Sequence, residues 1–528
     1  MENLRMSMLG LEDFRPAAPR ADENRKVSAA AHFGASNAKE FASWLASNGS
    51  ADADLNPDLA TLRTRSRDLQ RNHGVASGVL QTMGDNIVAT GPRLAMLPDY
   101  RALGKDIEWA QEYSLQVEGG FRSWFESKEI DVRGLMDGGM IARLVLESAL
   151  ASGDVIALPI WNPSPNRKWA TQLQILEGDR LSNPNGKWDS ESLRGGVEID
   201  KYGRPLAYHI EKAHPGDRFR IWSSNLSQWE RIPAETAWGR KRVIHVYRSD
   251  RPDQSRGKPL MAALIGEFKM LSKYQQAELQ AAVINAVIAA TLKTPLDGAA
   301  AGDLLGLQDG GPNSKQYAAH VASTEKILKP FNGAFLAHLP PGTELDTWTP
   351  GRPSDAFGPF VQVVLEHIAA GLNLPVELLL KKWSDSNYSS ARAALLEAWR
   401  MFLTYRKWLK VTFLDVLVEL WLEEAIDKRV VNIITLDDFY RNRYAYLQCK
   451  FRWPGRGWVD PVKEAQGAEI RMNIGISTLD AECAEQGQDW QEVADQRAVE
   501  KAYLESRNLT YGDMRPIAPE KQEEKQAA

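Results

Sequence analysis

Hydrophobic residues recur at helical spacing over most of the chain, so we expect a mainly helical protein. The first firm stripe lies within residues 62–88, where apolar side chains recur every three, four or seven positions until Gly74 interrupts them. A second, Ala-rich stripe begins near Leu260 and indicates a helix packed closely between neighbours. The helices expected on these grounds, besides 62–88, are 106–126, 135–152, 260–293 and 355–371, the last ending at Gly371.

The longest stripe begins at Ser389, after which apolar positions step by three or four as far as Leu420. At 1.5 Å per residue this helix would be on the order of 50 Å long. A helix of that length cannot bury its apolar face within one small domain. We therefore expect it to pack along equally long neighbours or to cross between domains.

Between about Val155 and Val246 the period changes to the alternation of β-strands, with short runs separated by turn signals. The clearest unit is a hairpin around the turn DKYG, whose inward-facing residues should be Val197, Ile199, Leu206, Tyr208 and Ile210. The sequence thus predicts an α+β fold, mainly helical, with one inserted β-rich module.

The two ends and one central stretch carry weaker patterns. Residues 1–60 are rich in Ala, Asn, Asp and Ser, and predict a flexible arm with one short helix near 38–46. The central stretch 295–353 is rich in Gly, Pro and Asp, with strand candidates in EKILKPF and AFLAHL. Near the C-terminus three helices are expected, capped by Asp460, by Ser477 or Thr478, and by Asp489, before a disordered tail at 511–528.

Composition and charge narrow the class of protein. The net charge of −5 argues against a protein that coats nucleic acid, although it suits one that DNA passes without sticking. No secretory signal is legible and the longest apolar run, 281–292, is too short for a bilayer, so we expect a soluble protein made inside the cell, without a membrane partner. Cys449 and Cys483 have no redox or metal spacing, and should be buried or half-exposed thiols.

The usual catalytic signatures are missing from the sequence. There is no phosphate-binding loop, nucleophile elbow or paired C-x-x-C. The close pair His209 and His214 is interpreted as solvent-facing rather than metal-binding, and Asp437 with Asp438 as a helix cap. We therefore expect no catalytic residues, no cofactor and no bound metal.

Charged residues around the polar loop WSDSNYSS remain as candidate functional residues. Lys381 and Lys382 precede the loop, and Ser389 or Ser390 is a suitable N-cap for the long helix. Arg392 would then lie in the first turn, where the helix dipole disfavours a cation by a few tenths to about 1 kcal/mol. Either Arg392 is solvated and the cost is tolerated, or it pairs with a carboxylate or phosphate from another segment or subunit.

Three segments of the chain resemble the lambda-like family of bacteriophage portal proteins. They are LRTRSRDLQRNHGVASGVLQTMGDNIVATG, PFVQVVLEHIAAGLNLPVELLLKKWSDSNYSSARAALLEAWRMF and ISTLDAECAEQGQDWQEVADQRAVE, within roughly residues 55–510. The helix end IAAGLNLP, followed by a polar loop and YSSAR, is the most specific mark. The resemblance implies a ring, typically of twelve subunits, at one capsid vertex around a DNA channel.

The resemblance also implies an architecture of wing, stem, clip and crown. On this chain it gives an N-terminal arm at 1–60, a wing at 61–258, a stem helix at 259–294, a clip at 295–353, a second stem helix at 354–379, a channel loop at 380–389, a long wing helix at 390–430, a C-terminal wing or crown at 431–510 and a tail at 511–528. The channel loop would present Lys381, Lys382, Ser384, Asp385, Ser386, Asn387 and Tyr388, while Arg392 would anchor the loop or contact a neighbouring subunit.

The function implied by the resemblance is that of a non-enzymatic conduit in the virion, assembled in the host cytoplasm. Its partners would be other copies of the chain, the terminase motor, the major capsid or scaffold protein, head-completion proteins and double-stranded DNA bound without sequence preference. Two alternatives stay open: a DNA-processing nuclease, which would need several acids converging on a metal, and a helical adaptor without a channel.

Overall fold

The computed structural model describes residues 43, 46–217, 228–287, 291–293, 344–346, 357–384, 388–457, 460–507 and 509. The chain divides into the units Met1–Ser50 and Ala51–Ala528, and every element below belongs to the second unit. Most of the helix expected near 38–46 lies outside the described residues, and so do the strands expected in EKILKPF and AFLAHL, the tail at 511–528, and Asp385, Ser386 and Asn387.

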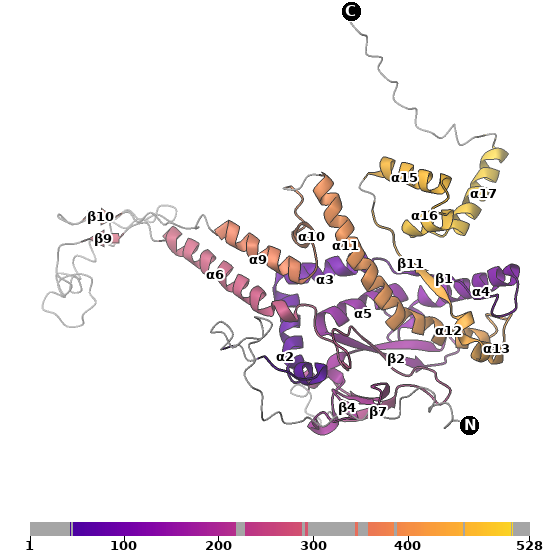
Figure 1. The fold of residues 1–528 in the computed structure, drawn as a ribbon, viewed down its shortest axis with the longest axis horizontal. Helices are drawn as coiled ribbons and strands as arrows, with labels where there is room; N and C mark the ends of the chain where they lie inside the picture. Colours follow the sequence, from indigo (N-terminus) through magenta and orange to yellow (C-terminus); the bar gives the residue numbers. More distant parts are fainter. Residues whose placement is uncertain are drawn as a thin grey trace, which may run out of the picture. The chain divides into compact units, whose positions relative to one another are not determined.

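Helices dominate the described part of the chain, as the sequence predicts (Figure 1). Their bounds are α2 (Ala51–Asn72), α3 (Gly74–Ile87), α4 (Ile107–Phe125), α5 (Gly138–Ser152), α6 (Ile265–Val287), α9 (Phe357–Gly371), α10 (Val376–Leu380), α11 (Tyr388–Leu409), α12 (Asp415–Asp427), α13 (Leu436–Arg441), α14 (Arg443–Tyr446), α15 (Pro461–Asn473), α16 (Leu479–Glu485) and α17 (Trp490–Ser506). None of these described helices is both long and apolar enough to cross a bilayer.

Helix α2 begins at Ala51, within the segment 1–60 that the sequence predicts to be a flexible arm. Pro57 lies inside the helix and normally argues against one, since it lacks the N–H donor of a helix interior. The segment is nevertheless held by the burial of Leu55 and Leu59, and Asp52 accepts hydrogen bonds from the N–H and hydroxyl of Ser255. Tertiary packing therefore overrides the local signal.

The strands form small antiparallel sheets. The central sheet has the order β3-β2-β8, and a four-stranded sheet has the order β4-β5-β6-β7. The bounds are β1 (Arg93–Met96), β2 (Asp154–Trp161), β3 (Thr171–Glu177), β4 (Leu193–Arg194), β5 (Val197–Ile199), β6 (Pro205–Glu211), β7 (Trp229–Pro233), β8 (Ile244–Tyr247), β9 (Thr291–Lys293), β10 (Glu344–Asp346) and β11 (Cys449–Arg452). Strand β1 pairs with β11, and β9 with β10.

The hairpin predicted around DKYG is present as β5 and β6, with one side chain misassigned. Val197 pairs with Tyr208 and Glu198 with Ala207, but Ile199 pairs with Pro205. Leu206 is the extra residue of this β-bulge, and its side chain is 50% exposed rather than buried. The alternating pattern alone could not show where the register shifts.

The long helix expected at 390–430 is observed as three consecutive helical segments. Helix α11 continues into a π-helical turn at Lys410–Leu414 and then into α12, which ends at Asp427. An ion pair between Lys410 and Asp415, 2.7 Å long, spans the turn. The π-turn adds a residue to the helical repeat and shifts the buried face along the helix.

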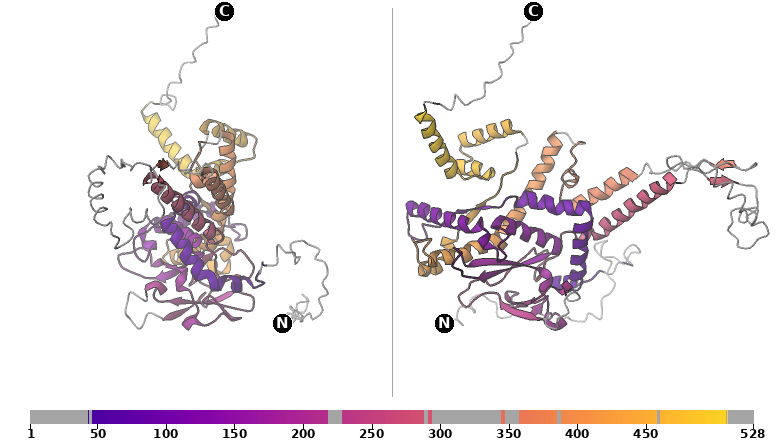
Figure 2. Two further views of the ribbon diagram at one scale, coloured as in Figure 1. Left: turned by 90° about the vertical axis from the view of Figure 1, so that its left-hand side faces the viewer. Right: turned by 180° about the vertical axis from the view of Figure 1, so that it is seen from behind.

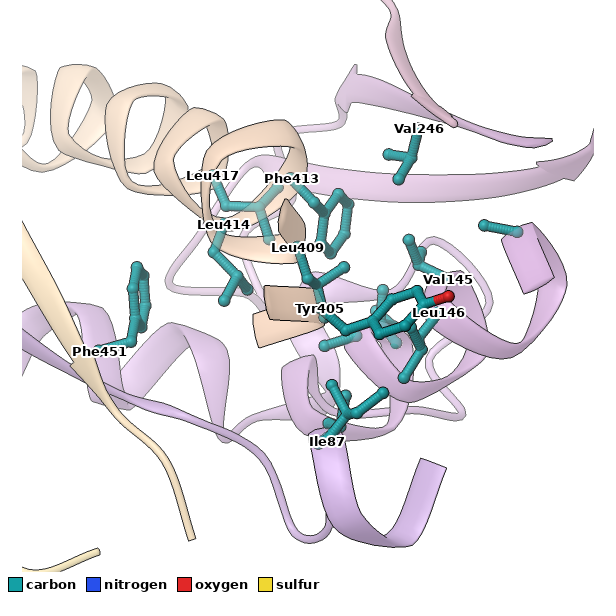
Figure 3. Close-up of a cluster of buried hydrophobic side chains, with 14 of the residues drawn as sticks. Ile87, Val145, Leu146, Val246, Tyr405, Leu409, Phe413, Leu414, Leu417 and Phe451 are labelled. Carbon is teal, nitrogen blue, oxygen red and sulfur yellow. The ribbon is translucent and has the colours of Figure 1, made fainter. Parts of the chain in front are cut away.

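One large hydrophobic core joins the long helix to the N-terminal helices and the central sheet. Figure 3 shows its centre, where side chains from α3, α5, β8 and β11 surround those of α11, the π-turn and α12. The labelled residues are Ile87, Val145, Leu146, Val246, Tyr405, Leu409, Phe413, Leu414, Leu417 and Phe451. The long helix therefore buries its apolar face within its own chain over this stretch.

A buried ionic cluster ties α2 to the central sheet. The carboxylate of Asp154, which is fully buried, accepts from Arg63 at 2.7 Å and from Arg256 at 2.6 Å, and His245 lies 3.2 Å away. Burial opposes the charged carboxylate, but the two guanidinium groups outweigh it and hold the pKa of Asp154 well below its ordinary value. The segment SDRPDQSRGKPL, which follows β8, thus supplies a buried structural arginine, Arg256.

Candidate channel loop and its surroundings

The loop that carries the candidate lysines starts from a tightly capped helix end. The backbone N–H groups of Lys381 and Lys382 both donate to the carbonyl of Glu377, which closes the last turn of α10. Lys381 adopts the left-handed conformation, with φ 53° and ψ 33°, at a position where glycine is the usual residue. Lys381, Lys382 and Ser384 are all exposed.

The root of this loop is fixed to the core, although its lysines are exposed. Leu372 and Leu374 before α10, and Leu379 within it, are buried in the main hydrophobic cluster. Because these anchors precede the lysines by only a few residues, the position of Lys381 is set by the core.

The start of the long helix differs from the sequence prediction. Helix α11 begins at Tyr388, so neither Ser389 nor Ser390 is its N-cap, and both lie in the first turn. Arg392 is then the fifth residue of the helix, in its second turn. Because the dipole effect fades beyond the first turn, the cost expected for this arginine is smaller than the sequence suggested.

Arg392 lines a cavity of about 170 Å³ between the end of α3, α11 and the segment after β11. The carboxylates of Asp85 and Glu464 line the same cavity. Asp85 is already paired with Arg143 at 2.8 Å. The half-buried side chain of Arg392 makes no hydrogen bond or ion pair to any residue that the structure describes.

Arg406 lies on another wall of this cavity, and its role could not be inferred from the sequence. Its guanidinium donates to the carbonyls of Ile87, Asn86 and Pro454 at 2.9, 3.0 and 3.0 Å. Ile87 and Asn86 close α3, so the cation satisfies the free carbonyls at the negative end of a helix dipole. Burial lowers the pKa of Arg406 to about 10.

The two histidines weighed as a metal pair do not meet. His209 is largely buried and lies 2.6 Å from Glu198, so the prediction that it faces solvent is wrong. His214 Nε2 lies 2.9 Å from a carboxylate oxygen of Glu177, and with Asp179 these ligand atoms lie within 4.8 Å of one another. The guanidinium of Arg67 already pairs with Glu177 and Asp179 and supplies the positive charge that a metal would bring.

The helix start predicted at TLDDF is confirmed, with Thr435 rather than Asp437 or Asp438 as its cap. Thr435 is the N-cap of α13 and its hydroxyl oxygen accepts from the N–H of Asp438, whose carboxylate accepts from the same hydroxyl. The caps Asp460, Thr478 and Asp489 are confirmed in the same way.

An apolar groove of about 480 Å³ runs between α6 and α9, which lie side by side (Figure 2). Met270 from α6 and Phe360 and Val363 from α9 line it, with exposed fractions of 64%, 52% and 62%. The sequence predicted a helix packed closely between neighbours in this region, yet within the single chain these side chains face outward. The signal for α9 was its apolar residues on more than one helical face, as in PFVQVVLEHI.

Comparison with known proteins gives the family. The model of the family described as phage portal protein, lambda family, matches residues 37–406. Portal protein B of Escherichia phage lambda is 32% identical over 473 residues, covering 87% of each chain, and the portal protein of Escherichia phage N15 is 31% identical over 474 residues with the same coverage.

A solved structure titled as the virion of a native gene transfer agent particle is also similar, at 14% identity and a TM-score of 0.43. It covers 79% of this chain and 89% of its own. That level of likeness is too low to support an argument about this chain. The match to the family model and the identity to the two phage proteins are sufficient by themselves: the chain belongs to the lambda family of phage portal proteins.

Proposed function

We propose that this portal protein assembles as a closed ring of about twelve subunits at a capsid vertex, and that double-stranded DNA enters and leaves the head through its centre. Family membership supports this function. The chain would serve as a conduit and a docking platform, without catalysis of its own, and the terminase motor would supply the work of packaging.

We assign the regions of the portal architecture to this chain as the resemblance implies. The wing would comprise 61–258, the stem 259–294 and 354–379, the clip 295–353, the channel loop 380–389, the long wing helix 390–430 and the C-terminal wing or crown 431–510. Helices α6 and α9 would then be the two stem helices, and the buried cluster around Asp154 would brace the wing.

The observation that carries the ring is the groove between α6 and α9. Met270, Phe360 and Val363 expose apolar surface beside one another, on two helices whose other faces pack on the core. A contiguous exposed apolar surface of this kind marks a contact with another molecule. In a ring, the neighbouring subunit would cover the groove at every interface.

DNA would meet the ring at Lys381 and Lys382. Both are exposed, and the capped end of α10 fixes where their side chains begin. Because the subunit is net negative, a few lysines would touch phosphates without the steep attraction that a strongly basic lining creates. The other residues assigned to the channel loop by the resemblance are Ser384, Asp385, Ser386, Asn387 and Tyr388.

Arg392 would bind a carboxylate of the neighbouring subunit, with a DNA phosphate as the second choice. Its lack of a bonded partner among the described residues supports a partner from outside the chain. Further partners would be the terminase, the major capsid or scaffold protein and the head-completion proteins. Assembly would take place in the host cytoplasm, and the finished ring would remain in the virion.

The experiment that tests the DNA role is the double variant Lys381→Ala and Lys382→Ala. We expect rings of normal appearance by negative-stain microscopy, with reduced packaging or retention of DNA. The matched control removes two exposed lysines elsewhere, Lys187 and Lys201, and should package normally. Normal packaging by the loop variant would refute the DNA contact, and the absence of rings from the unmodified chain would refute the portal ring itself.

A further inference from the structure

The last three described helices, α15 to α17, are joined to the rest of the chain almost without apolar contact. Within their described residues, Leu504 is the one buried hydrophobic side chain, and it does not belong to the main hydrophobic cluster. The chain reaches these helices from β11 through the segment 453–460 (Figure 1). Their position must therefore be held by interactions of another kind.

Charged pairs supply that attachment, and all of them join a cation of the core to a carboxylate of α16, α17 or the cap of α17. Glu492 pairs with Arg122 at 2.5 Å and with Arg93 at 3.2 Å. The other pairs are Lys450 with Asp480 at 2.5 Å, Arg452 with Asp480 at 3.5 Å, and Arg452 with Asp489. The carboxylates are on one side and the cations on the other, so the two faces are complementary in charge.

The connecting segment has a fixed part and a part that can turn. Arg406 binds the carbonyl of Pro454, which holds the chain to the core up to that residue. Beyond it, Gly455 and Gly457 impose few backbone restrictions. A side chain on Gly455 would meet the backbone of Glu485 and Gln486, so this glycine allows the segment to pack directly on the end of α16.

We propose that α15 to α17 form an electrostatic latch, a unit that is docked on the core by these charge pairs and released as a whole when salt screens them. The exposed pairs that Glu492 makes with Arg122 and Arg93 weaken as the Debye length falls from about 10 Å at 0.1 M to about 3 Å at 1 M salt. The pair of Arg452 with Asp489 is buried on both sides, so salt screens it less and it should be the last to release. Apolar packing does not weaken in this way, so the core stays folded while the latch opens. The proposal rests on contacts within one subunit and does not depend on the ring.

Hydrogen–deuterium exchange of the full-length protein tests the latch. Helices of this length are marginal in water without tertiary contacts, so undocking should appear as faster exchange. Between about 50 and 500 mM sodium chloride we expect the rates of deuterium uptake in α16 and α17 to rise together by roughly fivefold or more. Loss of one exposed ion pair at the upper end of the usual range, about 1 kcal/mol, changes the docking equilibrium by that factor. Peptides from α3 and α5 should not change.

Two variants separate the latch from a general effect of salt. Arg122→Gln removes a docking cation from the core side without touching α17, and Glu492→Gln removes its partner from the other side. Both should give, at low salt, the rapid exchange that the unmodified protein shows at high salt. The matched control is Arg133→Gln, which removes an exposed arginine outside the latch and should leave exchange unchanged.

Three results would overturn the proposal. They are exchange in α16 and α17 that does not respond to salt, a rise confined to one end of α17 as in simple fraying, or equal behaviour of Arg122→Gln and Arg133→Gln.

Discussion

The groove between α6 and α9 makes the ring proposal testable at one side chain, Phe360. Its ring lies 5.0 Å from that of Tyr274, so one side packs within the chain while 52% of the residue is exposed. The change to examine is Phe360→Asp, which places a charge where the neighbouring subunit is expected to sit. Since the altered surface faces outward, the isolated subunit should fold as before.

The expected effect follows from the area that the neighbour would cover. A phenylalanine buries about 200 Å² when fully enclosed, so the exposed half represents about 100 Å². At about 25 cal/mol per Å², covering it contributes about 2.5 kcal/mol to each interface, or roughly 70-fold in the association constant. Area converts only partly into affinity, but desolvating the new carboxylate adds a cost of its own. We therefore expect at least a tenfold higher protein concentration for ring formation.

Mass photometry over a concentration series measures the fraction of rings, and circular dichroism checks that the subunit remains folded. The matched control is Tyr202→Asp, which alters a more exposed aromatic residue in the turn of the β5–β6 hairpin. Rings of Phe360→Asp that persist to the same dilution as the unmodified protein would show that the groove is not a subunit contact.

Two further predictions concern stability. Arg406→Met removes charged hydrogen bonds to three backbone carbonyls, so it should lower the free energy of unfolding by about 4 kcal/mol and reduce the thermal unfolding midpoint. Arg400→Met, on the exposed face of the same helix, is the control and should change the stability very little. Equal shifts of the unfolding midpoint in the two variants would contradict the role assigned to Arg406. Burial raises the pKa of Asp480, but Lys450 and Arg452 outweigh it and lower the pKa below 3.8. The contribution of Asp480 to docking is therefore complete above pH 3.8 and is lost as the pH falls through the lowered pKa of this carboxyl. Hydrogen exchange in α16 should accelerate only in that acid range. Loss of protection in α16 at pH 5 would contradict the role assigned to Asp480.

Local signals in the sequence were sufficient to place most helix ends. Asp460, Thr478 and Asp489 cap their helices as predicted, because an N-cap depends only on a side chain and backbone groups two or three residues away. Gly74 likewise marks the break between α2 and α3. The α+β class followed from the change of period between Val155 and Val246, which is also a local property.

Features that depend on distant parts of the chain could not be predicted from the sequence. Helix α2 extends through Pro57 because Asp52 is held by Ser255, some two hundred residues away in the chain. The buried roles of Arg256 and Arg406 depend on carbonyls contributed by other elements. Nothing in the residues beside these arginines distinguishes them from the exposed arginines of the same segments.

Arg392 links the candidate loop to the latch, because one wall of its cavity belongs to the core and another to the latch. Asp85 lies on the core and is paired with Arg143, whereas Glu464 lies on α15 within the latched unit. Opening of the latch would carry Glu464 away and leave Arg392 on α11 with less negative charge around it. An arginine placed there would bind an outside carboxylate or phosphate more strongly when the latch is open than when it is closed. Under the two proposals together, the affinity of Arg392 for a neighbour or for DNA depends on the position of the C-terminal helices.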